Sequence, residues 1–295
     1  AVSGGPDSLA LAFLARIYSI EKKLRAKFYI VDHQLRPEST KEAKKVKECL
    51  KKIFVKAEIL TWTGKKKLKN IQSNARSARY KLLFQKSEKS RISNILVGHH
   101  QDDLFENFFI RMTRGSGLKG LISFDKKTKI EDKNILRPLL DQKKSDLVFI
   151  SKFVFNFYVN DPTNNIEKYQ RIKIRKFLNL LQKNGLDNNK FSKTIENLKR
   201  SNYVVDFYVN KNITKNSFYS NRSNKLFLKK NFFQQPYEIV FRSLSESLRF
   251  IGKKYYSARG KKLDRLINNF ENNHPLKVTL GGCIIEKINQ TVIIS

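Results

Sequence analysis

Apolar residues follow two different periods in the first 113 residues of the chain. In some segments they recur every three or four positions, which is the spacing of one helix face. In others they form short aromatic and β-branched runs typical of strands. The two kinds of segment take turns, which predicts an α/β fold with a parallel sheet and helices on both of its faces. The predicted strands are residues 26–35, 55–62 and 93–100, and the predicted helices are residues 10–20, 39–54, 70–89 and 102–113.

The pattern changes after about residue 187. Residues 186–215 and 235–255 are predicted to be helices, and residues 277–295 alternate around a turn at Gly281 and Gly282, as in a β-hairpin. We therefore expect an α/β domain followed by a smaller, mainly helical domain with a short β tail. The expected domains are residues 1–187 and residues 188–295.

Basic residues outnumber acidic residues by 60 to 26 in the chain of 295, which gives a formal net charge of +34. Residues 1–150 contain 33 basic and 16 acidic side chains, and residues 151–295 contain 27 and 10, so both halves share the excess. A polyanion is the natural partner of such a surface. Nucleic acid is favoured over a membrane because no basic amphipathic anchor is present. A charge that only keeps the protein in solution is the alternative.

No membrane span or secretory signal is predicted, because no apolar run approaches about 20 residues and the first residues are not basic. The two cysteines, Cys49 and Cys283, are far apart and cannot form a cysteine-rich metal or iron–sulfur site. We expect free thiols, a cytoplasmic protein and no contact with a membrane.

The segment VSGGPDS, residues 2–8, stands directly before the first predicted helix. Its glycines allow a tight turn whose N–H groups point into one concavity, and Ser3 and Ser8 add hydroxyl groups. Phosphate is the expected guest, although the lysine of a Walker loop is absent. Because Asp7 would repel phosphates, we expect it to hold a Mg²⁺ ion that bridges to them. A glycine-rich turn that only caps the helix is the alternative.

This segment resembles the pyrophosphate-binding loop of the N-type ATP pyrophosphatases, or PP-loop enzymes, whose pattern is Ser-Gly-Gly-x-Asp-Ser. The resemblance implies a Rossmann-like PP-loop domain that cleaves ATP between its α- and β-phosphates. An oxygen of the substrate is adenylated, and a nucleophile then displaces AMP. The implied ATP-binding residues of the loop are Ser3, Gly4, Gly5, Pro6, Asp7 and Ser8.

Five further segments follow along the chain: YIVDHQLRPESTKEA, NIQSNARSARYKLLF, VGHHQDDLFENFFIRMTRGSGLKGL, ILRPLL and NDPTNNIEKYQRIKIRKFL. In the same order, they resemble segments of the tRNA(Ile)-lysidine synthetase family. Gln72 stands where this family has Glu, and Asn107 stands where it has Thr. The resemblance covers about residues 1–180, and beyond them it rests mainly on TLGGC at residues 279–283.

The resemblance implies that ATP adenylates the carbon-2 oxygen of the wobble cytidine in an isoleucine tRNA with a CAU anticodon. Free L-lysine then attacks through its ε-amine and expels AMP. The expected cofactors are ATP and Mg²⁺, the expected partners are this tRNA and L-lysine, and a homodimer is an expected assembly. By elimination, residues 188–295 are expected to recognise the tRNA.

Acidic residues open the helix that follows the third predicted strand. Asp103 and Glu106, three positions apart, share one helix face. They are expected to bind the lysine ammonium, to hold a second Mg²⁺, or to accept a proton from the amine. The residues do not decide between these roles. Simple stabilisation of the helix N-terminus by Asp102, Asp103 and Glu106 is the alternative.

Arginine side chains offer forked donors to phosphates. We expect Arg76 to act in catalysis and Arg79, three positions later, to bind ATP, with a solvated basic helix face as the alternative. Arg114, Arg171 and Arg175 are weaker candidates for contacts with phosphate or tRNA.

The ends of the first and third predicted strands add Asp32, His33 and His100 as expected cofactor ligands, although a lone histidine is often structural. Aromatic residues among the basic residues of the second half are candidates to stack on unpaired bases, with burial in the core as the alternative. They are Tyr203, Phe207 and Tyr208.

Three other functions compete with this interpretation. A tRNA thiolase of the same superfamily would use clustered cysteines, which the chain lacks. A small-molecule amidotransferase or synthetase would not need so large a positive charge. A basic RNA-binding module with an inactive nucleotide fold would not need Ser3, Asp7 or Asp103, and only the departures at Gln72 and Asn107 favour it.

Overall fold

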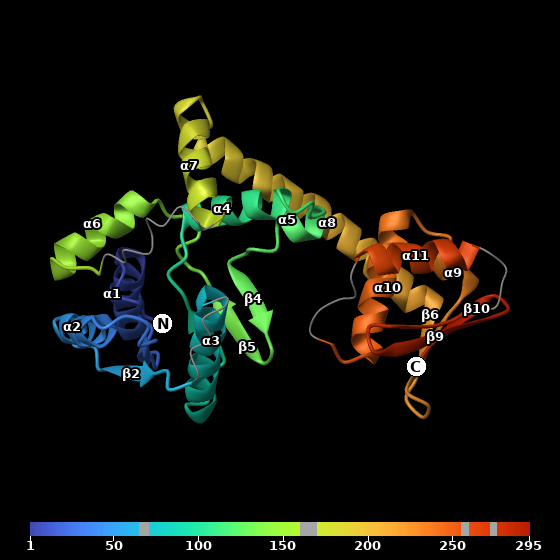
Figure 1. Cartoon of the computed structure of the whole chain (residues 1–295), viewed down its shortest axis with the longest axis horizontal. Helices are drawn as coiled ribbons and strands as arrows, with labels where there is room; N and C mark the ends of the chain where they lie inside the picture. Colours follow the sequence, from blue (N-terminus) through green and yellow to red (C-terminus); the bar gives the residue numbers. More distant parts are fainter. Residues whose placement is uncertain (65–70, 160–169, 255–259, 272–275) are drawn as a thin grey trace. The chain divides into compact units, whose positions relative to one another are not determined.

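The computed structural model describes residues 1–64, 71–159, 170–254, 260–271 and 276–295 (Figure 1). The chain divides into two compact units, Ala1–Lys190 and Phe191–Ser295. The division falls within the first turn of the long helix α8 (Asn188–Asn216). Each unit has its own hydrophobic core and is described separately below.

The first unit alternates helices and strands, as the hydrophobic pattern predicts. Its helices are α1 (Pro6–Glu21), α2 (Ser39–Lys51), α3 (Ile71–Lys89), α4 (Gln101–Met112), α5 (Leu118–Leu121), α6 (Lys144–Phe155) and α7 (Gln170–Lys183). Its strands are β1 (Phe28–Asp32), β2 (Ala57–Thr61), β3 (Asn94–Leu96), β4 (Lys127–Ile130) and β5 (Lys133–Leu136).

Parallel pairing dominates the strands of this unit. β1 pairs with β2 and β3 pairs with β5 in parallel, whereas β4 joins β5 as an antiparallel hairpin. The first residues of the chain lie between the two parallel pairs. The Val2 N–H donates to the Tyr29 carbonyl at 2.8 Å, and the Ala1 nitrogen donates to the Leu96 carbonyl at 2.9 Å. The loop of residues 3–8 therefore leaves the carboxyl edge of the parallel strands.

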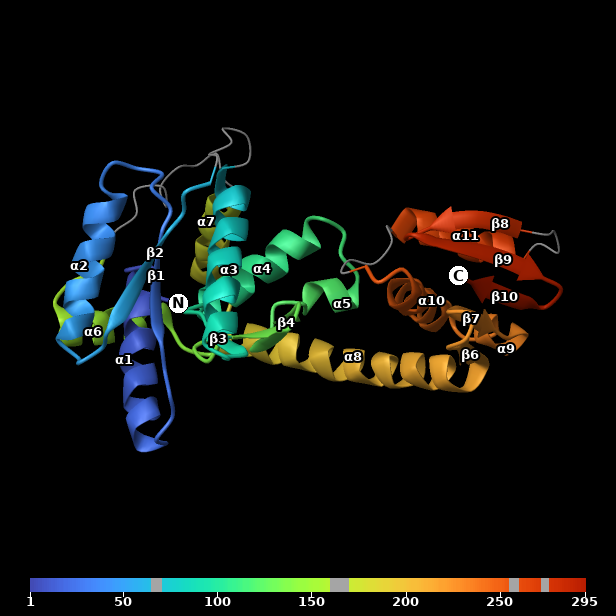
Figure 2. The same cartoon turned by 90° about the horizontal axis from the view of Figure 1, so that it is seen from below.

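Helices cover both faces of these strands, because alternate residues of a strand point to opposite sides. Ile30 packs with Val46 of α2 and Phe155 of α6, whereas its neighbour Tyr29 packs with Leu83 of α3. Figure 2 shows α1, α2 and α6 on one side of β1 and β2 and α3 on the other. The predicted α/β arrangement is confirmed.

The third strand is shorter than the sequence predicts. The expected strand spans residues 93–100 and is buried on both faces, but β3 comprises only Asn94–Leu96 and Asn94 is exposed. The strand ends because the chain at Gly98 lies directly against the first turn of α1. The residues after β3 therefore approach the loop of residues 3–8 instead of continuing the sheet.

The second unit contains more β structure than expected. The predicted hairpin around Gly281 and Gly282 is present, but its strands belong to a five-stranded antiparallel sheet in the order β6-β7-β10-β9-β8. The strands are β6 (Ser217–Ser220), β7 (Lys225–Leu228), β8 (Leu276–Leu280), β9 (Cys283–Ile288) and β10 (Thr291–Ile294). The helices after α8 are α9 (Lys230–Phe233), α10 (Tyr237–Ile251) and α11 (Gly260–Glu271).

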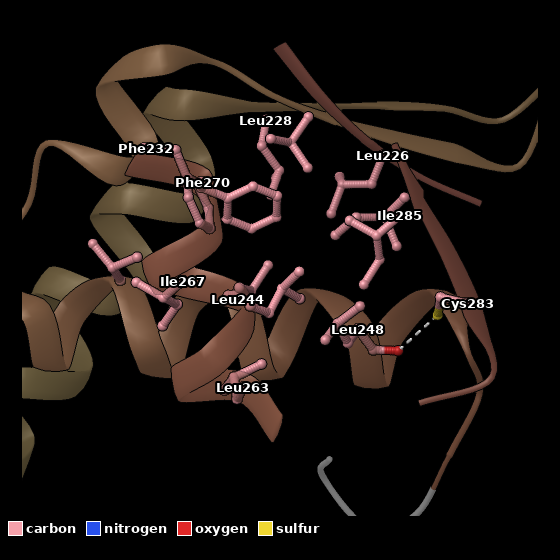
Figure 3. Packing of buried hydrophobic residues seen from close by; sticks show 14 of the residues in the cluster. Leu226, Leu228, Phe232, Leu244, Leu248, Leu263, Ile267, Phe270, Cys283 and Ile285 are labelled. Carbon is pink, nitrogen blue, oxygen red and sulfur yellow. Dashed lines mark hydrogen bonds between the residues drawn. The ribbon is translucent and has the colours of Figure 1, made fainter. Parts of the chain in front are cut away.

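The core of the second unit lies between this sheet and helices α10 and α11 (Figure 3). Leu244 and Leu248 of α10 meet Leu228 and Ile285 of the sheet, and all four side chains are almost completely buried. The Cys283 thiol donates to the Leu248 carbonyl at 3.4 Å. This apolar contact between helices and sheet holds the unit together.

Candidate active site

The loop of residues 3–8 is closed by the hydroxyl group of Ser8. Its oxygen accepts N–H groups from Ser3 and Gly4, both at 3.1 Å, and its proton goes to the Gly5 carbonyl at 2.9 Å. Gly4 has a φ of +90°, and a Cβ there would lie 2.6 Å from the Val46 side chain. Only glycine fits this position, so the loop is a compact turn that leads directly into α1.

Two neighbours fix the loop from outside. A Cβ at Gly98 would lie 3.0 Å from the Asp7 carbonyl and from the Ser8 nitrogen, so glycine is required for this close approach. The Ser151 hydroxyl of α6 donates to the Pro6 carbonyl at 2.6 Å. Sequence reasoning missed both residues, because neither contact follows from spacing along the chain.

Two carboxylates meet at one histidine beside this loop. His100 Nε2 lies 3.7 Å from Asp7 Oδ2 and 3.7 Å from Asp103 Oδ2. Asp7 Oδ1 is buried and has no hydrogen-bond partner among the residues that the structure describes. Burial raises the pKa of Asp7, and Asp103 adds to the effect, while His100 and Lys144 oppose it. An unpaired buried carboxylate oxygen at a phosphate-type loop is suited to a cation.

The donor set at this point fits Mg²⁺ bound together with a phosphate substrate. No group of three or more His, Cys, Asp or Glu side chains able to hold a metal occurs within the described ranges. Mg²⁺ normally takes one or two protein carboxylates and fills its other positions with water and substrate phosphates. Asp7, with its unpaired oxygen, is the residue of this site that could supply such a ligand.

His100 also begins α4. Its ring nitrogen Nδ1 accepts the backbone N–H of Asp102 at 3.3 Å, and its backbone N–H donates to Asp103 Oδ2 at 3.0 Å. The two hydrogen bonds together form a capping box. The carboxylate of Asp103 therefore caps the helix, as the capping alternative expects, whereas Asp102 contributes its backbone N–H to the capping box. Asp103 caps the helix and faces Asp7 at the same time.

Glu106 is held by Arg175. Arg175 Nε donates to Glu106 Oε1 at 2.7 Å, and Nη2 forms an ion pair with the same oxygen at 2.7 Å, which connects α4 to α7. The Glu106 side chain is 2% exposed, and its Oε2 is buried without a partner in the described part of the chain. Burial raises the pKa of Glu106, although Arg175 acts in the opposite direction. The sequence identifies both residues but does not indicate that they pair.

A second group lies at the carboxyl ends of β1 and β2. Asp32 is buried, and its carboxylate accepts the Gln34 N–H at 2.9 Å and the Thr40 hydroxyl at 2.7 Å, so it orders the loop after β1. His33 Nε2 accepts from Arg79 Nε at 3.4 Å. Burial and Arg79 lower the pKa of His33 to about 4, which keeps the ring neutral at physiological pH.

Comparisons with known proteins agree with this geometry. Residues 1–181 match the model of the PP-loop domain family. The tRNA(Ile)-lysidine synthase of Wolbachia pipientis wMel is 32% identical over 302 residues, covering 100% of this chain and 69% of that protein. The tRNA(Ile)-lysidine synthase of Orientia tsutsugamushi (strain Boryong) is 33% identical over 305 residues, covering 100% of this chain and 68% of that protein. The chain belongs to the tRNA(Ile)-lysidine synthase family.

Membership of the lysidine synthase family makes the chain a PP-loop enzyme that uses ATP and a ligase that forms a carbon–nitrogen bond. The U34-tRNA thiolase NcsA from Methanococcus maripaludis, solved with its [4Fe-4S] cluster, is similar in structure at 18% identity. The TM-score is 0.54, and the match covers 68% of this chain and 69% of that chain. At this identity the likeness concerns the fold.

The other arginines proposed for the site lie on α3, on α7 and directly after α4. Arg76 is exposed on α3, where its guanidinium lies 5.3 Å from the Tyr80 ring. Arg171 is exposed on α7, and its charge acts on Glu106. Arg114 Nη2 donates to Gln170 Oε1 at 2.9 Å.

A buried arginine that the sequence analysis does not single out lies beside this group. Arg137 donates to His99 Nδ1 at 3.2 Å and to the Asp125 carbonyl at 2.7 Å. Burial lowers the pKa of His99 to about 4. The Arg-Pro-Leu segment that contains Arg137 is the signal that points to it.

The sequence also singles out residues and segments beyond those just described. The Gln72 side chain and residues 160–169 lie outside the described part of the chain, whereas Asn107 Oδ1 is buried without a partner among the described residues. Cys49 and Cys283 are buried and free. None of the helices searched within the described residues is long and apolar enough to cross a membrane.

The aromatic candidates of α8 are exposed and do not enter the core. Their exposed fractions are 74% for Tyr203, 56% for Phe207 and 49% for Tyr208.

Proposed function

We propose that this enzyme joins L-lysine to carbon 2 of the wobble cytidine of a CAU-anticodon isoleucine tRNA. ATP first adenylates the carbon-2 oxygen and releases pyrophosphate. The lysine ε-amine then displaces AMP. The observation that carries this proposal is the meeting of Asp7 and Asp103 at His100 beside the loop of residues 3–8, in a chain of the lysidine synthase family.

The loop of residues 3–8 is proposed to receive the phosphates of ATP. Its backbone lies at the N-terminus of α1, where N–H groups and the helix dipole favour an anion. Asp7 would hold Mg²⁺, which neutralises the charge that develops on the phosphates. Arg76 and Arg79 are proposed to add fixed positive charge, while Asp32 and His33 shape the neighbouring loop.

Asp103 and Glu106 are proposed to receive the attacking lysine. An amine with a reference pKa of about 10.4 is protonated at neutral pH, so it must lose a proton before it attacks. Glu106 has a raised pKa and an unpaired Oε2, which suits it to hold the ammonium group and accept that proton. Arg175 keeps the Glu106 carboxylate in place.

The thiolase alternative is disfavoured by the state of the cysteines. A sulfur-transfer enzyme of this superfamily needs reactive thiolates. Burial raises the pKa of both Cys49 and Cys283, so each remains a protonated thiol at neutral pH. The two residues also belong to different units of the chain.

The second unit is proposed to recognise the tRNA. Residues 191–295 hold 19 basic against 7 acidic side chains. Removal of residues 191–295 should weaken tRNA binding and leave ATP binding to residues 1–190. Equal tRNA affinity in the truncated and full chains would contradict this assignment.

Incorporation of radiolabelled lysine into an unmodified transcript of the tRNA tests the proposal. Wild type should incorporate label only with ATP and Mg²⁺, and Asp7→Asn should not. Asp146→Asn is the matched control, because Asp146 also lies in the first turn of a helix, α6, but is exposed. A wild-type enzyme that binds ATP and this tRNA but transfers no lysine would contradict the proposal.

A further inference from the structure

The second unit contains a pocket that the proposed chemistry does not use. It has a volume of about 630 Å³ and lies between the C-terminal end of α8, the hairpin β6–β7 and the end of α10. Pockets of about 300–1,000 Å³ are the usual size for small organic ligands. Its wall is formed by Tyr219, Leu226, Ser247 and Phe250.

An aromatic corner forms one side of this pocket. The rings of Tyr219 and Phe250 meet edge to face, with centroids 5.1 Å apart and an interplanar angle of 79°. The Tyr219 hydroxyl donates to Asn224 Oδ1 at 2.8 Å, which holds the ring in place. Phe250 is 60% exposed, whereas Leu226, which also lines the pocket, is buried. An exposed ring on a fixed apolar support is a stacking surface for a flat, unsaturated group.

One buried hydroxyl in the pocket lacks a partner. The Thr214 and Ser217 hydroxyls donate to carbonyls of α8, at 2.8 and 2.7 Å. The Ser247 oxygen, in a residue only 3% exposed, has no hydrogen-bond partner among the described residues. A buried polar group without a partner costs free energy, which a ligand with a donor or acceptor at this point would recover.

The rim of the pocket is cationic. Arg249, Lys253 and Lys254 line it beside a single carboxylate, that of Glu246. Glu246 pairs with Arg249 at 3.5 Å. Lys253 and Lys254 form no ion pair within the described residues. The rim therefore carries free positive charge next to the stacking surface.

We propose that this pocket binds one unpaired nucleotide of the bound tRNA. The base stacks on Phe250, its polar edge meets the Ser247 hydroxyl, and its phosphate lies on Lys253 and Lys254. A ring surface combined with cations that follow the backbone is the usual arrangement for single-stranded RNA. This inference rests on the proposed function, because it takes tRNA as the substrate, and it adds a contact made by the second unit.

The test compares two phenylalanines of similar exposure in the same unit. Phe250 is 60% exposed in the pocket, whereas Phe218 is 63% exposed and precedes Tyr219 on β6, so it points to the opposite side of the strand. Binding of a fluorescein-labelled, unmodified CAU isoleucine tRNA transcript to the full chain is measured by anisotropy. Phe250→Ala removes the ring on which the base stacks, so this variant should bind the tRNA about tenfold more weakly than wild type.

Phe250→Tyr keeps the ring and should bind within about twofold of wild type, as should Phe218→Ala. The inhibition constant of single-stranded RNA should be about tenfold higher for Phe250→Ala than for wild type, whereas that of a fully paired RNA duplex should be the same for both. Lys253→Gln should reduce the slope of log affinity against log salt concentration by about 1. Thermal denaturation of each variant establishes that it folds.

Equal tRNA affinities of Phe250→Ala and wild type would overturn the proposal that the pocket binds a nucleotide. So would a loss of tRNA affinity in Phe218→Ala as large as that in Phe250→Ala. A wild-type chain that does not bind this RNA would overturn the pocket and the proposed function together. Lysine incorporation separates the two claims in the remaining cases. With saturating tRNA, Phe250→Ala should keep the wild-type kcat while its KM for tRNA rises. If wild type incorporates no lysine but its tRNA binding depends on Phe250, the pocket proposal is supported and only the proposed function is contradicted.

Discussion

The ion pair between Glu106 and Arg175 should contribute strongly to the stability of the first unit. Arg175 forms a hydrogen bond and an ion pair with one oxygen of the Glu106 carboxylate, whose side chain is 2% exposed. Removing one partner of a fully buried pair costs about 3–5 kcal/mol. The Arg175 side chain is 40% exposed, so water screens part of this charge. We expect Arg175→Gln to lower the free energy of unfolding by about 2 kcal/mol at neutral pH.

The loss should depend on pH in a definite direction. Burial already raises the pKa of Glu106 above its ordinary value of 4.5, and removal of Arg175 raises it further. Below this ordinary value the carboxyl is protonated in both the folded and the unfolded chain, so the missing cation matters little. Above it the unfolded chain ionises more readily, and the folded variant loses stability as the pH rises through the raised pKa.

Thermal denaturation at pH 5 and at pH 7.5 measures this effect. At pH 7.5 the midpoint for Arg175→Gln should fall by about 4–8 °C, since 1 kcal/mol corresponds to about 2–4 °C in a unit of this size. The fall should be smaller at pH 5. The double variant Glu106→Gln, Arg175→Gln removes the buried charge and should recover most of the loss. An equal fall at both pH values, or no recovery in the double variant, would refute the reasoning.

Other predictions concern the loop of residues 3–8 and its neighbours. Asp7→Asn should be at least as stable as wild type at pH 7, because burial raises the pKa of Asp7, but its ligation rate should fall about 100-fold or more; a destabilised variant would contradict this. Gly98→Ala should weaken ATP binding about tenfold by displacing the loop, whereas Gly117→Ala, where a Cβ meets no atom within 4 Å, should bind ATP normally in the same calorimetric titration. His33 should stay neutral from pH 5.5 to 8, because its pKa is about 4. The pH profile of ATP affinity near pH 6.5 should therefore be the same in wild type and in His33→Gln.

Long periodic segments were the part of the fold that the sequence could predict. The helices α2 and α10 each bury a regular stripe, so their existence is visible in the pattern, although the predicted helices run three and four residues past the observed C-terminal ends. The hairpins β4–β5 and β6–β7 are absent from the prediction. Each strand has four residues, too few to show a period, and their turns place Glu131 and Asn224 at positive φ without a glycine to mark them.

The site divides in the same way. Asp7, His100 and Asp103 belong to recognisable motifs, and the structure brings them together. The partner of Glu106 is 69 positions away, so only the packing of α7 on α4 reveals it. Gly98 is required because another segment approaches it, and such a contact leaves no trace in local spacing.

The identity of the wobble nucleoside after reaction tests the central claim most directly. An unmodified CAU isoleucine tRNA is incubated with the full chain, ATP, Mg²⁺ and L-lysine, then digested and analysed by mass spectrometry. We predict a single new nucleoside, cytidine carrying lysine, in place of the wobble cytidine, formed with one AMP and one pyrophosphate for each lysine transferred. An unchanged wobble cytidine, or a sulfur-containing nucleoside in its place, would contradict the account.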